Sequence, residues 1–324
     1  MSVGFDPSDL LALIEKEIAR MPLGTNPRSL YEPIRYIMKL GGKRIRPLFT
    51  MLSYSIYRND VETIAKYAAA IEAFHNFTLM HDDIMDKAPL RRGKPTVHEK
   101  YNSNTAILSG DVMLVKVYDM FLSLPGDQLK DVLTLFNKTA SEVCEGQQMD
   151  MDFETMKRVS EKQYLEMIRL KTAVLLAFSL ELGGILAGAP EEDRKALYNL
   201  GIQIGIGFQL MDDFLDVYGD KVNFGKAVGG DIVSNKKTFL LIKALEVARG
   251  RDKIELQKWL SAKKFDKRKK VAAVVKVYDS VGVRELTERM TAKYFDEGYR
   301  CLDRVNTNKG DLVTFVKSLA GRQK

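Results

Sequence analysis

The spacing of the apolar residues constrains this sequence most. Apolar side chains recur at intervals of three and four residues almost everywhere, as in LLALIEKEIARM, YEPIRYIMKL and SEKQYLEMIRLKTAVLLAFSLELGGIL. Such spacing places them on one face of an α-helix, whereas the strict alternation that is typical of half-buried strands between hairpin turns is missing. The pattern predicts an all-α protein built as a large helical bundle.

Short turn-forming segments, rather than a linker, interrupt the helical pattern. They include KAPLRRGKP at 87–95, GAP at 188–190 and GKAVGG at 225–230, and a helical pattern resumes after each of them. No Ser/Pro-rich stretch or change in composition divides the 324 residues. We therefore expect a single domain that spans residues 1–324. The charge run KKFDKRKK at 263–270 is interpreted as a solvated loop between late helices.

The charge and the termini limit the cellular context. The 50 Lys and Arg residues exceed the 43 Asp and Glu residues by seven, an excess that suits an anionic small substrate as well as a nucleic acid or a membrane surface. No apolar run approaches the roughly 18 to 20 residues of a membrane span, and the N-terminus is too acidic for a signal peptide. Cys144 and Cys301 form neither a metal-binding spacing nor a disulfide framework. These features predict a cytoplasmic protein without an integral membrane segment.

Two copies of Asp-Asp-x-x-Asp each end an apolar helical run. They read HDDIMD at 81–86 and MDDFLD at 211–216, about 130 residues apart. On a helix the first and third carboxylates lie one turn apart on one face, where they repel. One isolated triplet is equally typical of a solvated turn or a helix cap, but two copies in apolar surroundings require a cationic partner. Oxygen-only ligands favour Mg²⁺, and the predicted ligands are Asp82, Asp83, Asp86, Asp212, Asp213 and Asp216.

Basic residues stand near both triplets. They occur in GGKRIRP at 41–47, which holds Lys43, Arg44 and Arg46, in RRGKPTVH at 91–98, which begins with Arg91 and Arg92, in the pair Lys171-Thr172, and at Lys226 and Lys236. Arginine binds phosphate through two parallel hydrogen bonds and lysine binds it as a point charge. Each basic residue alone is more typical of surface charge. Lys171 is the exception, because its apolar neighbours predict a buried counter-charge.

These motifs, in this order and across most of the chain, resemble those of the trans-isoprenyl diphosphate synthases. The resemblance implies an all-helical bundle around a central cavity, a homodimer, and Mg²⁺ bound by both triplets and by an allylic diphosphate. That diphosphate is expected to contact Arg91, Lys171, Thr172, Gln209, Lys226 and Lys236. Isopentenyl diphosphate is expected to contact Lys43, Arg46, His75 and Arg92.

The expected reaction is a chain-elongating prenyl transfer. Asp82, Asp86, Asp212, Lys171 and Lys226 are the predicted catalytic residues, because metals and basic side chains at the departing diphosphate favour ionisation of the allylic C–O bond. A terpene cyclase would need no second substrate site, and a non-catalytic partner subunit would be expected to have lost one triplet. A nucleic-acid-binding helical protein would leave the aspartates unexplained.

The helix that leads into the first triplet is expected to set product length. Phe77 and Phe74 stand five and eight residues before Asp82, a spacing of three that keeps both on one side of the helix. Phe74 is equally well interpreted as an ordinary core residue. In the resembling family, an aromatic residue at position 77 followed by a small one, here Thr78, is most similar to the geranylgeranyl-forming synthases. We therefore expect mainly a C20 product, with farnesyl diphosphate (C15) as the alternative.

Overall fold

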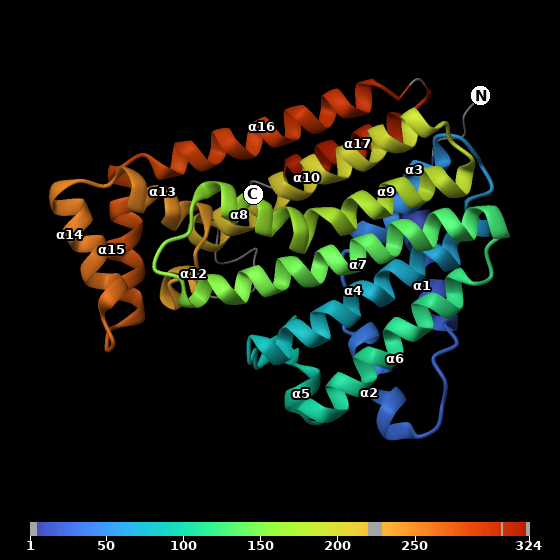
Figure 1. The fold of residues 1–324 in the computed structure, drawn as a ribbon, viewed down its shortest axis with the longest axis horizontal. Helices are drawn as coiled ribbons and strands as arrows, with labels where there is room; N and C mark the ends of the chain where they lie inside the picture. The colour runs from blue at the N-terminus through green and yellow to red at the C-terminus, as the bar shows by residue number, and fades with distance from the viewer. Residues whose placement is uncertain (1–4, 220–228, 306, 322–324) are drawn as a thin grey trace. The chain divides into compact units, whose positions relative to one another are not determined.

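The computed structural model describes residues 5–219, 229–305 and 307–321, and within them the expected all-α fold is confirmed (Figure 1). Apart from one two-residue hairpin, every regular element of the described residues is helical. The hairpin lies in the segment at 87–95 that the sequence marked only as a break.

The first elements along the chain are α1 (Pro7–Arg20), α2 (Arg28–Lys39), α3 (Ile45–Ser55), η1 (Val61–Ile64), α4 (Ala65–Met85), β1 (Leu90–Arg91), β2 (Lys94–Pro95), α5 (Val97–Lys100) and α6 (Ser103–Phe121). They are followed by α7 (Gly126–Thr155), α8 (Glu161–Ile168), the π-helical turn η2 (Arg169–Ala173), α9 (Val174–Ala187) and α10 (Glu191–Tyr218). The remaining helices are α12 (Gly230–Ser234), α13 (Phe239–Val247), α14 (Gly250–Ser261), α15 (Lys267–Ser280), α16 (Val283–Asp303) and α17 (Gly310–Ala320).

The chain forms two compact units. Unit 1 contains the described residues of 1–138, 178–198 and 304–312, and unit 2 contains those of 139–177, 199–303 and 313–324. Most of the positions at which the chain passes from one unit to the other fall inside helices rather than in linkers. The expectation of one domain over residues 1–324 stays a prediction.

Helix α4 is the centre of unit 1. It packs against α6, α3 and α1, and α6 packs in turn against α2. Phe74 of α4 lies edge-on to Phe136 of α7 with ring centroids 5.0 Å apart, and both rings are buried. Offset and edge-on aromatic pairs stabilise a core beyond the area they bury. The C-terminal end of α4, with the first triplet, is therefore attached to a rigid helix.

The hairpin of β1 and β2 follows α4 directly. Its turn residues, Arg92 and Gly93, have φ angles of 52° and 73°, and Arg91 pairs with Lys94 across the ladder. A two-residue turn with two positive φ angles matches the twist of the strands that it joins. The turn reverses the chain so that the arginines after the first triplet return toward the end of α4.

Unit 2 places α10 close to the segment before it. A Cβ atom added at Gly201 would lie 2.3 Å from the Cα of Ala177, and one added at Gly205 would lie 2.5 Å from the Cα of Ala173. Only glycine permits this approach. It brings the helix with the second triplet against the helix that follows Lys171.

The second half of unit 2 is packed around α13 and α15. Helix α13 contacts α8, α15 and α16, while α15 also contacts α12 and α14. Leu256, Val274 and Tyr278 form part of the core between these helices. This core supports α12, which follows the second triplet in the sequence.

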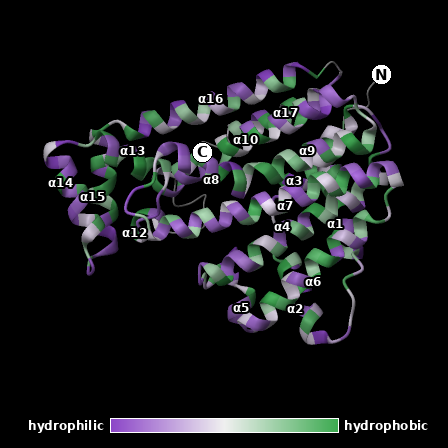
Figure 2. Cartoon of the chain, in the orientation of Figure 1, coloured by the Kyte–Doolittle hydropathy of each residue, from purple (hydrophilic) through white to green (hydrophobic). Residues whose placement is uncertain are grey.

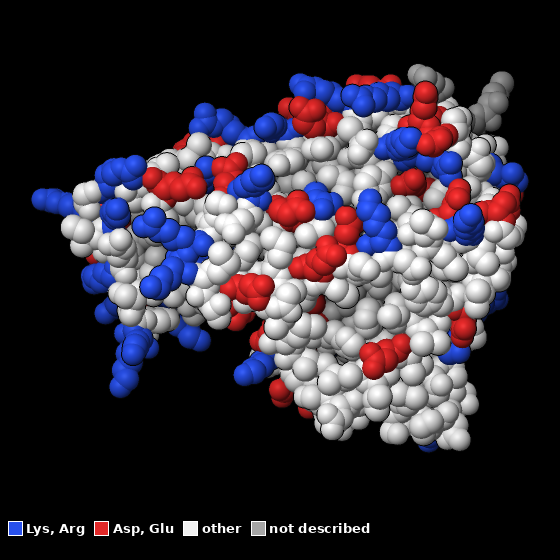
Figure 3. Space-filling model, viewed as in Figure 1, with Lys and Arg blue, Asp and Glu red and all other residues white. Residues whose placement is uncertain are grey.

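The charge run at 263–270 differs from its interpretation as a loop. Lys263 and Lys264 are exposed in the loop between α14 and α15, but residues 267–270 form the first turn of α15. Lys270 is fully buried, and its ammonium donates to the carbonyl of Val233 and to the side-chain oxygen of Asn235. Figure 3 shows basic side chains gathered over α14 and α15.

One helical stretch is apolar enough to resemble a membrane span by length and composition. It runs from Glu161 to Ala187, although the sequence analysis expected no such run, and Figure 2 shows its α9 part as strongly hydrophobic. In the structure 78% of its most apolar window is buried inside the protein. The stretch is therefore interpreted as a core helix.

Candidate active site

The first aspartate triplet lies at the C-terminal end of α4, with Asp86 as the C-cap residue. The helix dipole places partial negative charge at this end, so three carboxylates are unfavourable here without a cation. Asp83 is only 2% exposed, whereas Asp82 is partly exposed and Asp86 is exposed. The middle carboxylate therefore faces the protein, and the outer two lie on the accessible side.

Arg91 on the hairpin binds the buried carboxylate of this triplet. Its Nε and Nη2 atoms donate to the two oxygens of Asp83 over 2.8 and 2.7 Å. Such two-point pairs fix both partners in orientation. The charge of Asp83 is thus balanced by an arginine, and Asp82 and Asp86 are the members of the triplet that can meet a metal from solvent.

The second triplet repeats this division near the C-terminal end of α10. Asp213 is 4% exposed, and it accepts hydrogen bonds from the hydroxyl of Tyr164 and from Nε2 of Gln209, the latter over 3.0 Å. Burial raises the pKa of Asp213 to about 6, although the positive charge of Lys236 acts in the opposite direction. Asp212 is exposed and Asp216 is partly exposed.

Asp231 lies beside the second triplet, although it was not among the predicted site residues. It lies in the first turn of α12, where its backbone N–H donates to Oδ2 of Asp216 over 2.9 Å. Burial raises the pKa of Asp231 to about 7, and the nearby charges of Asp213 and Asp216 contribute. The sequence feature that could have indicated a role for Asp231 is its position directly after the glycine pair at 229–230. Two buried carboxyl groups with raised pKa values thus lie together beside Lys236, and such perturbed groups are typical of functional sites.

Lys171 lies in the π-helical turn, and its expected counter-charge is Asp150. The ammonium and the carboxylate are 2.7 Å apart, and both side chains are largely buried. Turns of this type are often found at functional sites, because the extra residue redirects the side chains around it. A Cβ atom added at Gly146 would lie 2.3 Å from the backbone nitrogen of Lys171, so α7 approaches the turn closely.

Thr172, the next residue of the turn, connects Lys171 to the second triplet. Its hydroxyl donates to Oε1 of Gln209 over 3.0 Å, and Gln209 in turn donates to Asp213. Lys236 lies after α12, and its charge acts on the carboxyl groups of both Asp213 and Asp231. Lys226 lies outside the described residues.

The residues expected at isopentenyl diphosphate lie in unit 1. Nη1 of Arg46 is 3.1 Å from Nε2 of His75. Burial, followed by the charges of Arg46 and Arg92, holds the pKa of His75 well below its ordinary value. The imidazole is therefore neutral at pH 7, so the positive charge of this group comes from the arginines.

Arg92 and Lys43 belong to the same region. The guanidinium of Arg92 lies against Gly42, where an added Cβ atom would be 2.9 Å from its Nη2 atom. Gly42 has a φ angle of 154°, and Lys43, the next residue, is exposed. The glycine pair thus lets the arginine of one loop pack directly on the other loop.

Arg44, the remaining basic residue of GGKRIRP, has a structural position. It is 3% exposed, and its guanidinium lies 2.6 Å from Glu72 and 2.7 Å from Glu15. A buried arginine between two carboxylates ties α1 and α4 to the start of α3. The sequence had placed Arg44 with Lys43 and Arg46 in one cationic cluster, because letters alone do not show which way each side chain points.

The residues expected to set product length differ in burial. Phe74 is 1% exposed within the aromatic core, whereas Phe77 is partly exposed and its ring lies 4.8 Å from that of His81. Thr78 is also partly exposed and donates its hydroxyl to the carbonyl of His75. Phe77 therefore lies between the packed core and the region of the first triplet.

No group of three His, Cys, Asp or Glu side chains in the described part of the chain converges closely enough to hold a metal by itself.

The family model described as polyprenyl synthetase matches residues 27–278. A geranylgeranyl diphosphate synthase of Methanosarcina mazei is 36% identical over 281 residues, which cover 86% of this chain and 85% of that protein. Two solved structures are also similar. A crystal structure of a geranylgeranyl pyrophosphate synthase has a TM-score of 0.94, 40% identity, and covers 99% of this chain and 100% of its own. The structure of the Corynebacterium glutamicum geranylgeranyl pyrophosphate synthase, complexed with isoprenyl diphosphate and magnesium, has a TM-score of 0.85 and 27% identity. The match covers 98% of this chain and 97% of that one.

Proposed function

The chain belongs to the polyprenyl synthetase family and is a prenyltransferase, and we propose that it joins isopentenyl diphosphate to an allylic diphosphate to form mainly geranylgeranyl diphosphate. The observation that carries the proposal is the repeated arrangement of the two triplets. In each, a buried middle aspartate is held by neighbouring donors, and two outer aspartates lie on the accessible side.

The donor set fits Mg²⁺. The outer residues Asp82, Asp86, Asp212 and Asp216 supply carboxylate oxygens, and both triplets lie where helix dipoles add negative charge. When bound, the metal would stabilise negative charge on the departing diphosphate. Asp83 and Asp213, which the sequence analysis also counted as ligands, are proposed to hold Arg91 and the Tyr164–Gln209 pair in place.

The basic residues of unit 2 are proposed to bind the allylic diphosphate. Lys171 is held by Asp150, so its ammonium has a fixed position and does not pay the entropy of a mobile lysine on binding. Thr172 and Gln209 add a hydroxyl and an amide, and Lys236 lies beside the buried carboxylates. Arg91 of unit 1 and Lys226, which lies outside the described residues, stay predicted contacts of the same diphosphate. Together these side chains favour departure of the diphosphate from the allylic carbon.

The second substrate is proposed to bind in unit 1. Arg46 lies beside a neutral His75, and Arg92 and Lys43 come from the two adjoining loops. A neutral imidazole can donate one hydrogen bond to a diphosphate oxygen while the arginines neutralise its charge. The isopentenyl double bond would then attack the allylic cation, and the proton lost from the new chain would pass to the released diphosphate.

A C20 product is supported by the residues before the first triplet and by the similarity to several geranylgeranyl diphosphate synthases. The partly exposed Phe77 is the proposed floor for the growing chain, with Thr78 leaving space beside it. Farnesyl diphosphate is the alternative product.

A homodimer is proposed across α6. Leu108 and Val115 of α6 and its C-cap residue Leu122 are 58%, 56% and 61% exposed, and their spacing of seven residues puts them on one stripe. Figure 3 shows few charged side chains where α6 lies in Figure 1. Large exposed apolar side chains in a row are typical of an interface. Light scattering should give twice the chain mass for the wild type, and Val115→Lys should lower the measured mass.

We also propose that the protein acts in the cytoplasm.

Incubation with labelled isopentenyl diphosphate and C5, C10 or C15 allylic starters, each with Mg²⁺, tests the function. The proposal predicts label in a C20 product from all three starters. Products that stop at C15 from the two shorter starters would instead identify a farnesyl synthase. Consumption of the allylic substrate without label would indicate a terpene cyclase. A chain that is folded but inactive alone would fit the partner-subunit hypothesis.

A further inference from the structure

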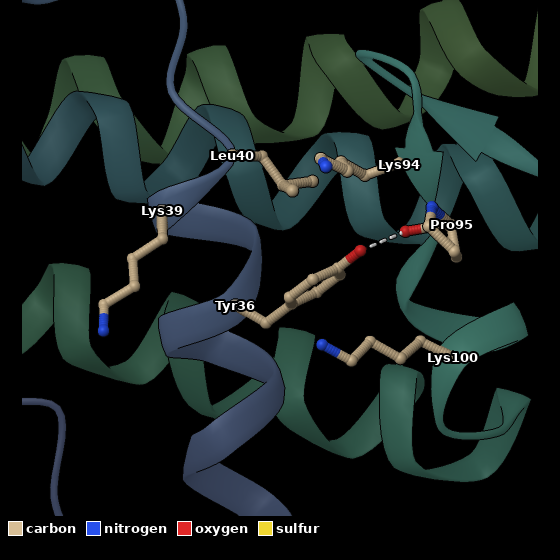
Figure 4. Close-up of a pocket in the computed structure, with 6 residues that line it drawn as sticks. All are labelled: Tyr36, Lys39, Leu40, Lys94, Pro95 and Lys100. Atoms are coloured by element: carbon tan, nitrogen blue, oxygen red, sulfur yellow. Dashed lines mark hydrogen bonds between the residues drawn. The ribbon is translucent and has the colours of Figure 1, made fainter.

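A cavity of about 510 Å³ in unit 1 is lined by basic and apolar side chains and takes no part in the site described above. Its lining residues are Tyr36, Lys39, Leu40, Lys94, Pro95 and Lys100, and Figure 4 shows how they lie. Three of the six carry a positive charge, and no carboxylate is among these described lining residues. The volume is in the range of small-molecule sites, roughly 300 to 1,000 Å³.

The wall of this cavity is held in position by Tyr36. Its hydroxyl donates to the carbonyl of Pro95 over 2.7 Å, which ties α2 to the hairpin (Figure 4). The ammonium of Lys100 lies 3.7 Å from the centroid of the Tyr36 ring, a cation–π contact that orients it. In Figure 4 the side chains of Lys94 and Lys100 both extend toward Tyr36. The Tyr36 ring thus gives the cavity a fixed aromatic surface beside the ammonium of Lys100.

Among the described lining residues, all charges are positive. No ion pair of Lys39, Lys94 or Lys100 with a carboxylate is found among the described residues. Three like charges that share one cavity repel, and an anion removes that repulsion. The ligand chemistry that this arrangement favours is a compact polyanion next to a small apolar group that can contact Leu40, Pro95 or the ring.

The cavity adjoins the two loops that carry residues of the proposed isopentenyl site. Lys39 and Leu40 immediately precede Gly41 and Gly42, and Lys94 follows Arg92 by two residues. Gly42 lies against the guanidinium of Arg92. The cavity thus shares the loop at 39–43 and the hairpin with the residues that are proposed to bind isopentenyl diphosphate for reaction.

We infer that this cavity is a second diphosphate site, which takes isopentenyl diphosphate before it reaches Arg46 and His75, or inorganic diphosphate after the reaction. The inference rests on the proposed function. Both ligands present the same anionic group, so the experiment must tell them apart.

The test compares two double variants. The pocket variant is Lys94→Gln/Lys100→Gln, and the control is Lys16→Gln/Lys130→Gln. The control removes the same charge from exposed lysines elsewhere in unit 1. Isopentenyl diphosphate alone cannot react, so calorimetry at low ionic strength can count its sites. We expect two per chain in the wild type and the control, and one in the pocket variant. The pocket variant should also show a fall of about three- to tenfold in kcat/KM for isopentenyl diphosphate, with kcat unchanged and the difference lost at high salt.

The source of the ligand follows from a parallel titration with inorganic diphosphate. If inorganic diphosphate inhibits the control more strongly than the pocket variant while kcat/KM for isopentenyl diphosphate is equal in both, the site serves the released product. If the pocket variant and the control bind isopentenyl diphosphate alike, have the same kcat/KM and are inhibited equally by inorganic diphosphate, the cavity is not a diphosphate site. A wild type without prenyl transfer would instead refute the proposed function, which the same wild-type assay measures separately.

Discussion

Replacement of Phe77 by alanine should lengthen the product by about one isoprene unit. Phe77 is partly exposed on α4, five residues before Asp82, and Phe74 lies one turn further back in the buried aromatic core. A chain that grows from a diphosphate near Asp82 along α4 meets Phe77 first. Removal of that ring exposes the next layer, which Phe74 and Phe136 form.

The expected length follows from helix geometry. Three residues of α-helix rise about 4.5 Å, and one isoprene unit adds about 5 Å if each of its four chain bonds of ~1.5 Å advances a little over 1 Å. One layer of side chain therefore corresponds to one unit, and Phe77→Ala should shift the main product from C20 to C25. Further removal of Phe74 should extend it again, but loss of a fully buried phenylalanine costs about 3 to 5 kcal/mol of stability. The single variant is therefore the informative one.

Chromatography of the dephosphorylated products measures the change. Phe77→Tyr retains the aromatic floor and should keep the wild-type length. A Phe77→Ala enzyme whose products match those of the wild type and of Phe77→Tyr would show that the floor lies elsewhere.

Three further predictions concern substrate binding, pH and packing. Lys43→Ala or Arg46→Ala should raise the KM for isopentenyl diphosphate by about tenfold or more and leave that for the allylic substrate unchanged; equal effects on both would refute the assignment. Burial raises the pKa of Glu181 to about 7, so the folded state holds a proton that the unfolded state loses, and stability should fall as pH rises from about 4.5 to 7. Chemical denaturation at pH 8 should give Glu181→Gln a free energy of unfolding about 1 kcal/mol higher than that of the wild type, after allowance for the partial exposure of Glu181. A variant whose free energy of unfolding falls between about pH 4.5 and 7 more steeply than that of the wild type would contradict this. Gly146→Ala should cost about 1 to 3 kcal/mol of stability, because its Cβ would overlap the backbone of Lys171; an unchanged unfolding midpoint would disprove that contact.

The sequence predicted the helices and the paired state of Lys171. Apolar spacing alone located α4 and α10, and the triplets lie at their C-terminal ends. The buried counter-charge of Lys171 was also predicted from apolar neighbours, because a lysine among them must be paired. These successes share one cause: periodicity and burial of charge are local properties that letters can show.

Features that depend on the path of the chain in space could not be predicted. The pairing of Arg91 with Asp83 requires the hairpin turn at Arg92, and nothing in RRGKPTVH specifies which arginine returns to α4. Arg44 and Arg46 stand two residues apart, so they lie on different sides of the chain, and only one of them is buried between carboxylates. Asp231 is close to Asp216 because α12 turns back over α10, which requires packing against α15.

The most direct test of the proposed metal-binding role of the two triplets is the turnover of Asp82→Asn and Asp212→Asn. Each substitution retains size and removes one charge from the accessible side of one triplet, and Asp127→Asn, at an exposed position in α7, is the matched control. Turnover should be measured with isopentenyl and allylic diphosphates at saturating Mg²⁺, with the unfolding midpoint of each variant recorded alongside. We predict a fall of about three powers of ten for both variants, with an unchanged midpoint and a near-normal control. Near-normal turnover in either Asp82→Asn or Asp212→Asn would contradict the account.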